Sequence, residues 1–412
     1  DTLVKQADTY ADRNPLPEVQ HTTDPQGSLL TQSGPLWREH RRFFTAALRK
    51  SGVGKMKLES KIKEEAVALL EKISSTRGEP FDPSHCVNIS IANIISSIAF
   101  GDRFGYSDPK LIELLSILHT SVTASSFFRF GNFLPFLFYT PLYNGVRRRA
   151  KSVREYFRQQ IREHRRTFQP DQMRDVIDMY LSEIDKKIGN EGSVLFSEHV
   201  LELAIHDLFL AGSDTTTNTI LWSVLILAKY PEVQEKIQKE IDDVIGFGRM
   251  PAMEDKHSMP YTSATLKEIM RFRTVIPVIF RNTNADSHVN GYVIPAGATV
   301  FVSISAALHD GMVFESPQEF KPERFMSEES NAVKEACITF GAGRRVCLGE
   351  GLAKTELFLL FTSLFQRFTF SAPGDDPNSL GLGGVFGIVN KPLPFKICAR
   401  DRYETGYIPT YA

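Results

Sequence analysis

One stretch of this chain decides its fold: Phe340-Gly-Ala-Gly-Arg-Arg-Val-Cys-Leu-Gly349. It presents a single thiol, Cys347, directly before residues 348–368, whose apolar composition predicts a long and largely buried helix. Gly343 and Gly349 permit left-handed turns and the close approach of a bulky planar ligand on either side of the sulfur. The stretch therefore predicts a loop that offers one cysteine to a metal.

The residues around Cys347 favour its thiolate form. Arg344 and Arg345 add positive charge, and the following helix begins with a positive dipole, so we expect the pKa of the Cys347 thiol to be lowered. Phe340 is placed to cover the sulfur and keep water from it. A lone cysteine is more often a buried structural residue. This pattern instead favours a thiolate that holds iron.

The pattern Phe-x-x-Gly-x-Arg-x-Cys-x-Gly resembles the haem-binding signature of the cytochromes P-450, the haem-thiolate monooxygenases. The resemblance implies a long central helix and small peripheral sheets around a buried haem b. Cys347 would be the axial ligand, whose thiolate favours cleavage of the oxygen–oxygen bond. Phe340, Arg345 and Gly349 would be further cofactor contacts.

The resemblance covers nearly the whole chain and is greatest to the microsomal family-two branch, notably at residues 34–43 and 341–359. It implies the cytosolic face of the endoplasmic reticulum membrane. Members of that branch begin with a membrane anchor, a first helix and two strands. We expect residues 1–412 to form a single cytochrome P-450 domain that lacks these parts.

Composition narrows the class of protein. The 412 residues are 42% hydrophobic and 24% charged, which suits a globular protein with a large core. A formal net charge of −1 gives no reason to expect a nucleic-acid partner. The four cysteines have neither CxxC spacing nor the density of a disulfide scaffold, which favours a reducing compartment.

Periodicity predicts a mainly α fold with minor β. The predicted helices up to residue 168 are 37–48, 56–73, 86–100, 109–126 and 146–168. The longest helix begins near Ser197 and ends at Tyr230, before Pro231, and at about 1.5 Å per residue it would cross the molecule. Residues 274–306 alternate and contain the turn signal Asn290-Gly291, which predicts a small sheet.

Inside the longest predicted helix lies Ala211-Gly-Ser-Asp-Thr-Thr216. A glycine there costs about 1 kcal/mol relative to alanine, and a threonine can bond back to the carbonyl four residues earlier, so we expect one weakened turn. Such a cluster alone also fits helix packing. It resembles the family's Ala-Gly-x-Asp-Thr-Thr element, which implies that Asp214 and Thr215 deliver protons to dioxygen and that Ala211 contacts the haem.

Three further resemblances are individually weaker. Trp37-x-x-x-Arg41 is similar to the family's helix that donates to a haem propionate, which Arg345 and Arg281 would also contact. Arg281 lies four residues after Pro277, whereas relatives often place the basic residue five after. The family's bracing network would comprise Glu268, Arg271 and Arg324. Spacing alone does not identify it, because surface pairs such as Glu39 and Arg42 share it.

The substrate side follows from helix geometry and the resemblance. Asp207, Ala211 and Thr215 share one helix face. The matching apolar positions of the family's pocket imply a lipophilic ligand, such as a fatty acid, steroid or xenobiotic; they are Leu208, Val275, Ile276, Val278, Ile279, Val385 and Phe386. A second interpretation is that a nearby side chain satisfies Asp207, the commoner fate of a buried acid.

Residues 127–149 combine many aromatic side chains with the basic run Arg147-Arg-Arg149. This composition suits a membrane interface, and it equally suits a core segment capped by a solvated charge run. The resemblance favours the membrane, since microsomal members of the family dip a similar segment into the bilayer.

Monooxygenation needs two external electrons, and no flavin or nicotinamide site is evident. The resemblance implies NADPH-cytochrome P-450 reductase as the donor, with cytochrome b5 as a further partner. A basic patch on the cysteine side would suit an acidic reductase, although a solvated charged face is the alternative; it comprises Arg38, Arg41, Arg42, Lys321 and Arg344.

Three functional hypotheses remain at this point. The first is the monooxygenase. The second is a haem enzyme that rearranges or dehydrates peroxides without a reductase, and the third is a haem-free fragment that acts by binding alone. The intact pair Asp214 and Thr215 favours the first, because members that act on peroxides often alter it.

Overall fold

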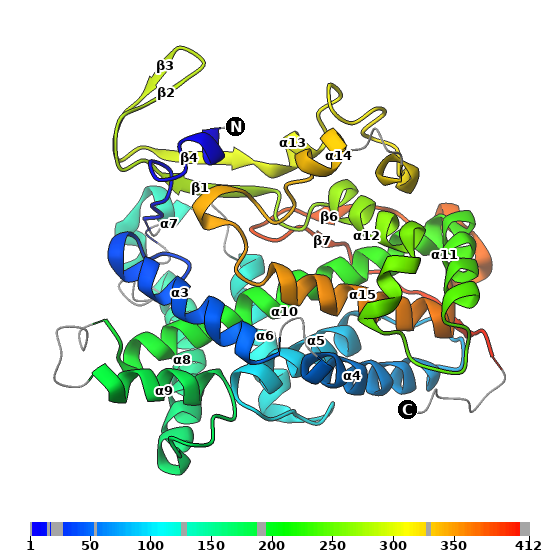
Figure 1. Ribbon diagram of the computed structural model, residues 1–412, viewed down its shortest axis with the longest axis horizontal. Helices are drawn as coiled ribbons and strands as arrows, with labels where there is room; N and C mark the ends of the chain where they lie inside the picture. Colours follow the sequence, from blue (N-terminus) through cyan, green and yellow to red (C-terminus); the bar gives the residue numbers. More distant parts are fainter. Residues whose placement is uncertain are drawn as a thin grey trace.

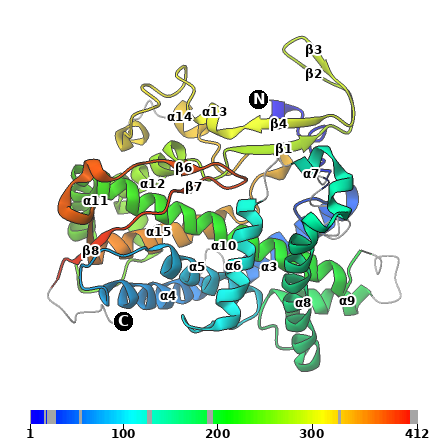
Figure 2. The same ribbon diagram turned by 180° about the vertical axis from the view of Figure 1, so that it is seen from behind.

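The long central helix is present as α10, Glu198–Lys229. Ser197 caps it, since its side-chain oxygen accepts a hydrogen bond from the backbone N–H of Val200 at 3.3 Å. At the other end Pro231 begins the next helix, α11 (Pro231–Val244). In both views of the structure, a computed structural model, α10 lies in the middle of the molecule (Figure 1 and, from behind, Figure 2).

The structure describes residues 2–14, 17, 28–52, 56–124, 130–187, 195–326 and 331–403. The five shorter helices predicted up to residue 168 are confirmed with ends shifted by at most three residues. They are α3 (Gly34–Lys50), α4 (Met56–Ser74), α5 (Ser84–Ala99), α6 (Pro109–Ala124) and α8 (Asn144–Thr167). The helix predicted after the cysteine is α15 (Glu350–Arg367), which begins only after Gly349.

Further helices fill the remaining length. The α-helices are α1 (Thr2–Lys5), α7 (Phe130–Phe133), α9 (Val176–Lys187), α12 (Pro260–Phe272), α13 (Ile304–Leu308) and α14 (Asn331–Ala336). Short 3₁₀ turns lie at Pro135–Tyr139, Pro141–Tyr143, Met253–Ser258, Pro322–Phe325, Gly343–Arg345, Pro373–Asp375 and Pro377–Ser379.

The predicted small sheet is confirmed as two antiparallel pairs. Strand β1 (Val278–Asn282) pairs with β4 (Thr299–Ser303). Between them β2 (Ser287–Val289) and β3 (Tyr292–Ile294) form a hairpin that projects from the body in both views (Figures 1 and 2). Its turn is Asn290-Gly291, and both residues have positive φ, as a two-residue hairpin turn requires.

Two further antiparallel pairs lie near the end of the described chain. Strand β5 (Phe368–Ser371) pairs with β8 (Cys398–Asp401), and β6 (Gly384–Val385) pairs with β7 (Lys391–Pro392). The sequence analysis predicted neither pair, and strands of two residues, such as β6 and β7, carry no readable alternation. All the sheets among the described residues have two strands, which confirms a mainly α fold with minor β.

The core follows the central helix. Residues of α4, α5, α10 and α15 join one continuous apolar cluster, in which Trp222, Phe361 and Phe365 are fully buried. Each such side chain contributes about 1.5–3 kcal/mol by leaving water. This packing makes α10 and α15 rigid supports for the segments around them. No helix within the described ranges has the length and apolar character needed to cross a membrane.

Candidate active site

The cysteine loop closes on itself immediately before α15. The backbone N–H of Cys347 donates to the carbonyl of Phe340 at 2.9 Å. Gly341 and Gly343 have φ of +77° and +73°, and a Cβ at Gly343 would clash with the carbonyl oxygen of Leu3. The left-handed turn expected at Gly349 is wrong, because its φ is −91°. A Cβ at Gly349 would meet no atom within 4 Å, so space is open beside it.

The expected direction of the Cys347 pKa is also wrong. Burial raises the pKa of this thiol, and the N–H of Gly349 and the charge of Arg41 lower it by less. The side chain is nevertheless exposed, so the sulfur faces an open space within dense surroundings. A bound metal ion deprotonates a coordinating thiol outright. A thiolate at this position would therefore depend on a bound metal ion more than on the helix dipole.

Four arginines gather beside this loop, and we call them the arginine cluster: Arg13, Arg41, Arg281 and Arg345. Arg41 donates to the carbonyl of Val346 at 2.6 Å, and Arg281 donates to the carbonyl of Arg345 at 3.4 Å. The guanidinium carbon of Arg345 lies 3.8 Å from the ring centroid of the buried Trp37. The structure thus brings together the residues predicted to contact the propionates.

Burial dominates the electrostatics of the arginine cluster. Burial, followed by the neighbouring positive charges, lowers the pKa of Arg345 to about 8 and that of Arg281 to about 9. Since a guanidinium stays protonated in proteins, these lowered pKa values express the cost of burying the charges. Burial likewise lowers the pKa of Arg13 to about 10.

The arginine cluster lacks matching anions. Among the described residues no carboxylate forms an ion pair with any member, and Arg13 Nε has no hydrogen-bond partner. Against the lowering by burial, the negative charges of Asp12 and Asp207 raise the pKa of Arg345 and Arg13, respectively, without forming an ion pair with them. Buried cations without anions are costly, so the cradle fits a ligand with two carboxylates, such as haem. Sequence reasoning missed Arg13, because one arginine in a loop carries no pattern.

The middle of α10 borders an open space. Between Val200 and Lys229, Ala211 is the one residue that this otherwise buried helix exposes. Thr215 lies one turn further on the same face, and its hydroxyl donates to the carbonyl of Ala211 at 2.8 Å, as predicted. The weakened turn is not opened, because α10 is continuous. A Cβ at Gly212 would lie 2.6 Å from Ile95 Cδ1, so this glycine lets α5 pack closely.

Asp214 forms a contact that the sequence did not predict. Its Oδ1 lies 3.0 Å from Lys391 Nζ, and the two side chains are 13% and 8% exposed. The other carboxylate oxygen, Oδ2, is buried without a hydrogen-bond partner. Because 177 residues separate the pair along the chain, no local pattern could have found it. Asp214 thus has one occupied and one free oxygen.

The predicted pocket segments meet at Asn390, the residue before β7. The backbone N–H of Asn390 donates to the carbonyl of Val275 at 2.8 Å, and Asn390 Nδ2 donates to the carbonyl of Thr274 at 3.3 Å. Phe386 and Val385, on the same hairpin, are 62% and 38% exposed. Leu208, Ile276, Val278 and Ile279 are half-buried.

Two predicted pocket residues differ in what they touch. A Cβ at Gly341 would lie 3.9 Å from Ile279 Cδ1, so Ile279 packs against the cysteine loop. Asp207 is buried instead, and its Oδ2 accepts from the Ser28 hydroxyl at 2.6 Å and the Leu30 N–H at 2.8 Å. The second interpretation of Asp207 is therefore the observed one, and this carboxylate holds a loop against α10.

The predicted bracing residues also come together. Glu268 accepts from Arg271 Nε at 2.7 Å and Arg271 Nη2 at 2.9 Å, and from Arg324 Nε at 3.1 Å. The backbone N–H of Lys321 donates to the same carboxylate at 2.9 Å. Three of these donors meet Oε1 and one meets Oε2, so both oxygens of this buried carboxylate are hydrogen-bonded, as its stability requires.

The predicted basic patch is partly neutralised within the chain. Arg344 pairs with Asp8 at 2.9 Å, Arg42 with Glu39 at 2.6 Å and Lys321 with Glu315 at 3.9 Å. Arg41 is turned toward the cysteine loop. The positive charge available to a partner on this side is therefore smaller than the sequence suggested.

An apolar patch lies on the segment predicted to contact a membrane. Its members are large and exposed, namely Phe133, Leu134, Phe136, Tyr139 and Leu142. Residues 127–129 lie outside the described residues. Arg147 of α8 donates to the carbonyl of Phe138 and to the side chain of Asn144, so it ties this segment to the start of α8.

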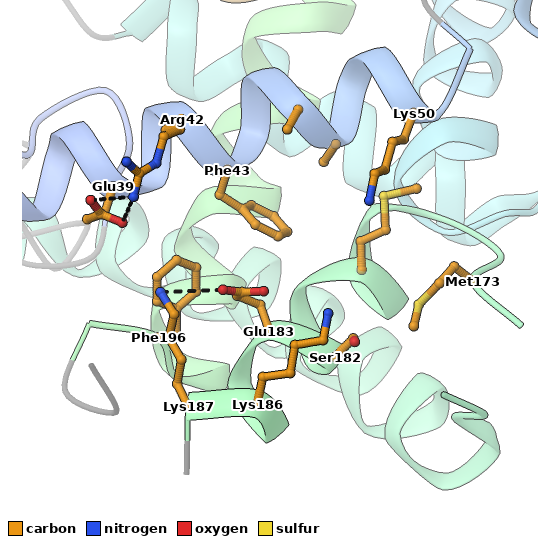
Figure 3. A pocket seen from close by; sticks show the side chains of 13 residues that line it. Glu39, Arg42, Phe43, Lys50, Met173, Ser182, Glu183, Lys186, Lys187 and Phe196 are labelled. Carbon is orange, nitrogen blue, oxygen red and sulfur yellow. Dashed lines mark hydrogen bonds and ion pairs between the residues drawn. The ribbon is translucent and has the colours of Figure 1, made fainter. Parts of the chain in front are cut away.

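A separate groove of about 310 Å³ lies between α3 and α9 (Figure 3). Phe43 and Phe196 contribute apolar surface, and its charged side chains include the pairs Arg42–Glu39 and Lys187–Glu183. None of its lining residues belongs to the predicted site, so this groove is no candidate for the substrate pocket.

Comparison with known proteins identifies relatives over almost the full chain. A sequence model of the family described as Cytochrome P450 matches residues 1–399. The chain is 39% identical to Cytochrome P450 2D15 of Canis lupus familiaris and to Cytochrome P450 2D6 of Homo sapiens, over 98% of this chain and 82% of each relative. It is 36% identical to Cytochrome P450 2U1 of Homo sapiens, over 98% of this chain and 75% of that relative.

Proposed function

The chain belongs to the cytochrome P450 family and is a monooxygenase of that family, and we propose that it hydroxylates a lipophilic small molecule with electrons from NADPH-cytochrome P-450 reductase. The balanced reaction joins substrate RH, one dioxygen, two electrons and two protons to give ROH and water. One oxygen atom enters the new carbon–oxygen bond, and the other leaves as water.

Haem b is the proposed cofactor, and when bound it supplies the iron centre that activates dioxygen. Cys347 would hold the iron through its sulfur. The arginine cluster and Trp37 would hold the two propionates. The single observation that carries this assignment is the arginine cluster, in which Arg281 and Arg345 are buried and no member has an ion-paired carboxylate within the described part of the chain, beside a loop that presents one exposed thiol.

Protons are proposed to reach the reaction through Asp214 and Thr215. The Thr215 hydroxyl is anchored on the carbonyl of Ala211 and keeps its lone pairs free. Asp214 keeps Oδ2 without a partner, so this oxygen can accept and release a proton. Two protons are consumed in each reaction.

The substrate is proposed to be apolar, of the fatty acid, steroid or xenobiotic class. Support comes from the apolar side chains that the β6–β7 hairpin exposes and from the half-buried aliphatic residues beside them. The exposed patch at residues 133–142 supports peripheral contact with the endoplasmic reticulum membrane on its cytosolic face. Cytochrome b5 is a second proposed electron donor.

A matched pair of threonine variants tests this function. With reductase and NADPH, Thr215→Ala should consume NADPH but release hydrogen peroxide in place of product. Thr219→Ala removes a hydroxyl bonded in the same way, to the carbonyl of Thr215 at 2.9 Å, and should keep the parent ratio of product to peroxide. Tight coupling in Thr215→Ala would contradict the proton role. Turnover of added peroxides without reductase would favour the peroxide-rearranging alternative.

A further inference from the structure

The β6–β7 hairpin lies beside α10 (Figure 1) and contacts the helix through Asp214 and Trp222. Asp214, Asn218 and Trp222 are spaced by four residues and so share this face. Trp222 Nε1 donates to the carbonyl of Asn390 at 3.1 Å, and Lys391 Nζ lies 3.0 Å from Asp214 Oδ1. Two adjacent residues, Asn390 and Lys391, thus bind the hairpin to α10.

From this arrangement we propose that Lys391 is a positioning residue that holds Asp214 for proton delivery and couples that function to the substrate-facing hairpin. The proposal rests on the proposed role of Asp214. Lys391 does not itself touch the reacting atoms. It acts through the carboxylate that it binds.

The contact between Lys391 and Asp214 is suited to fixing one geometry. Both side chains are largely shielded from water, at 8% and 13% exposure, so solvent screens their attraction little. The ammonium group occupies Oδ1 and leaves Oδ2 as the free oxygen. A carboxylate held at one oxygen cannot rotate freely, so the free oxygen stays oriented.

The β6–β7 hairpin connects Lys391 to the predicted substrate pocket. Lys391 stands opposite Val385 in the β6–β7 pairing, and Phe386 follows at 62% exposure. A ligand that contacts Val385 and Phe386 moves or steadies the strand to which Lys391 belongs. The position of the Asp214 carboxylate therefore responds to occupancy of the pocket.

The test begins with the ion pair itself. Denaturant unfolding of the haem-loaded protein is measured for Lys391→Met, Asp214→Asn and the double variant. We expect strongly non-additive shifts of the unfolding midpoint, because each single variant leaves a buried group unpaired. Additive shifts would show that the two side chains do not interact and would overturn the proposal.

The second measurement is hydrogen peroxide released per NADPH consumed, with reductase, with and without lauric acid as the probe. Lys391→Met should raise this ratio roughly twofold or more, and Lys391→Arg, which keeps the charge, should return most of the way to the parent ratio. Lys396→Met makes the same substitution at an exposed position near β7 and should match the parent.

Two outcomes separate this proposal from the function on which it rests. Adding Lys391→Met to Asp214→Asn should leave the peroxide ratio unchanged, since the acid is already lost. If Asp214→Asn raises the ratio and Lys391→Met does not, the role of Lys391 is refuted while the proton role of Asp214 stands. If Asp214→Asn keeps the parent ratio, the proposed function itself fails.

Discussion

Glu268 and Arg271 form a bidentate ion pair in which both side chains are fully buried. Arg271 also donates from Nη1 to the carbonyls of Leu308 and Pro317, at 2.9 and 3.0 Å. The pair therefore ties α12 to the chain segment before Pro322–Phe325. Removal of Glu268 would leave Arg271 without a carboxylate, and removal of Arg271 would leave Glu268 with Arg324 as its remaining cation and Oε2 without its donor.

Arg271→Met should destabilise the protein by about 3–5 kcal/mol, the cost of breaking a buried ion pair. Arg42→Met is the matched control, because Arg42 and Glu39 have the same spacing but their side chains are 76% and 31% exposed. Its effect should stay within about 1 kcal/mol. Denaturant unfolding measures both, and equal effects would contradict the structural role of burial.

The arginine cluster predicts how tightly the protein retains haem. Arg345→Met should speed haem loss to apomyoglobin by roughly tenfold or more, because a hydrogen bond to a charged group contributes about 1.5–3 kcal/mol. Arg344→Met changes the adjacent arginine, which is exposed and paired with Asp8, and should retain haem like the parent. Unchanged haem loss in Arg345→Met would remove this residue from the cofactor site.

Glu356 makes stability depend on pH. Burial raises the pKa of Glu356 to about 8, and the hydrogen bond from Thr216 at 3.2 Å offsets only part of this effect. The protonated acid therefore contributes stability that is fully present below the ordinary pKa of 4.5 and is lost as pH rises through about 8. Relative to the parent, the free energy of unfolding of Glu356→Gln should rise by up to about 1.4 kcal/mol per pH unit across that range.

Unfolding free energies at pH 5, 6.5 and 8 check this prediction. Glu71→Gln on the exposed side of α4 is the control and should follow the parent at every pH. Parallel pH profiles for Glu356→Gln and the parent would mean that Glu356 is ionised in the folded protein at neutral pH.

Two buried histidines should respond to pH in opposite directions. Burial lowers the pKa of His164, but the hydrogen bond and charge of Asp175, followed by the Gln160 carbonyl, outweigh burial and raise the pKa. Its ring nitrogens lie 2.8 Å from the carbonyl of Gln160 and 3.0 Å from Asp175 Oδ2. The stability that the charged ring contributes is present below pH 6.5 and is lost as pH rises through the folded pKa.

His164→Gln should therefore cost more stability at pH 6 than at pH 9. Burial is the main cause that lowers the pKa of His40. The stability of His40→Gln should therefore rise relative to that of the parent as pH falls. Thermal unfolding across this range compares the two variants. A cost of His164→Gln that is independent of pH would show that this ring is neutral in the folded protein.

Long local patterns made much of the fold predictable. The central helix was found because its N-cap Ser197, thirty-two residues of compatible sequence and the terminating Pro231 all lie within one segment. The β2–β3 hairpin was found because Asn290-Gly291 suits the positive φ of its turn. Such signals are local, so they can be interpreted without knowledge of how the helices and strands pack.

The parts that were missed depend on packing between distant segments. Arg13 and Lys391 are single charged residues whose neighbours in space are far away in the chain. The pKa of Cys347 was misjudged because desolvation depends on surrounding side chains, whereas a helix dipole can be inferred locally. Gly212 was interpreted as a weakened turn, although its closest constraint is Ile95 of another helix.

Carbon monoxide binding to the reduced protein tests most directly whether Cys347 holds the iron of a bound haem. We expect the haem-loaded protein to give the strongly red-shifted Soret band of thiolate ligation. Cys337→Ser should keep this band, and Cys347→Ser should lose it. A parent protein without the shifted band, or a Cys347→Ser variant that retains it, would contradict the assignment of Cys347 as the ligand.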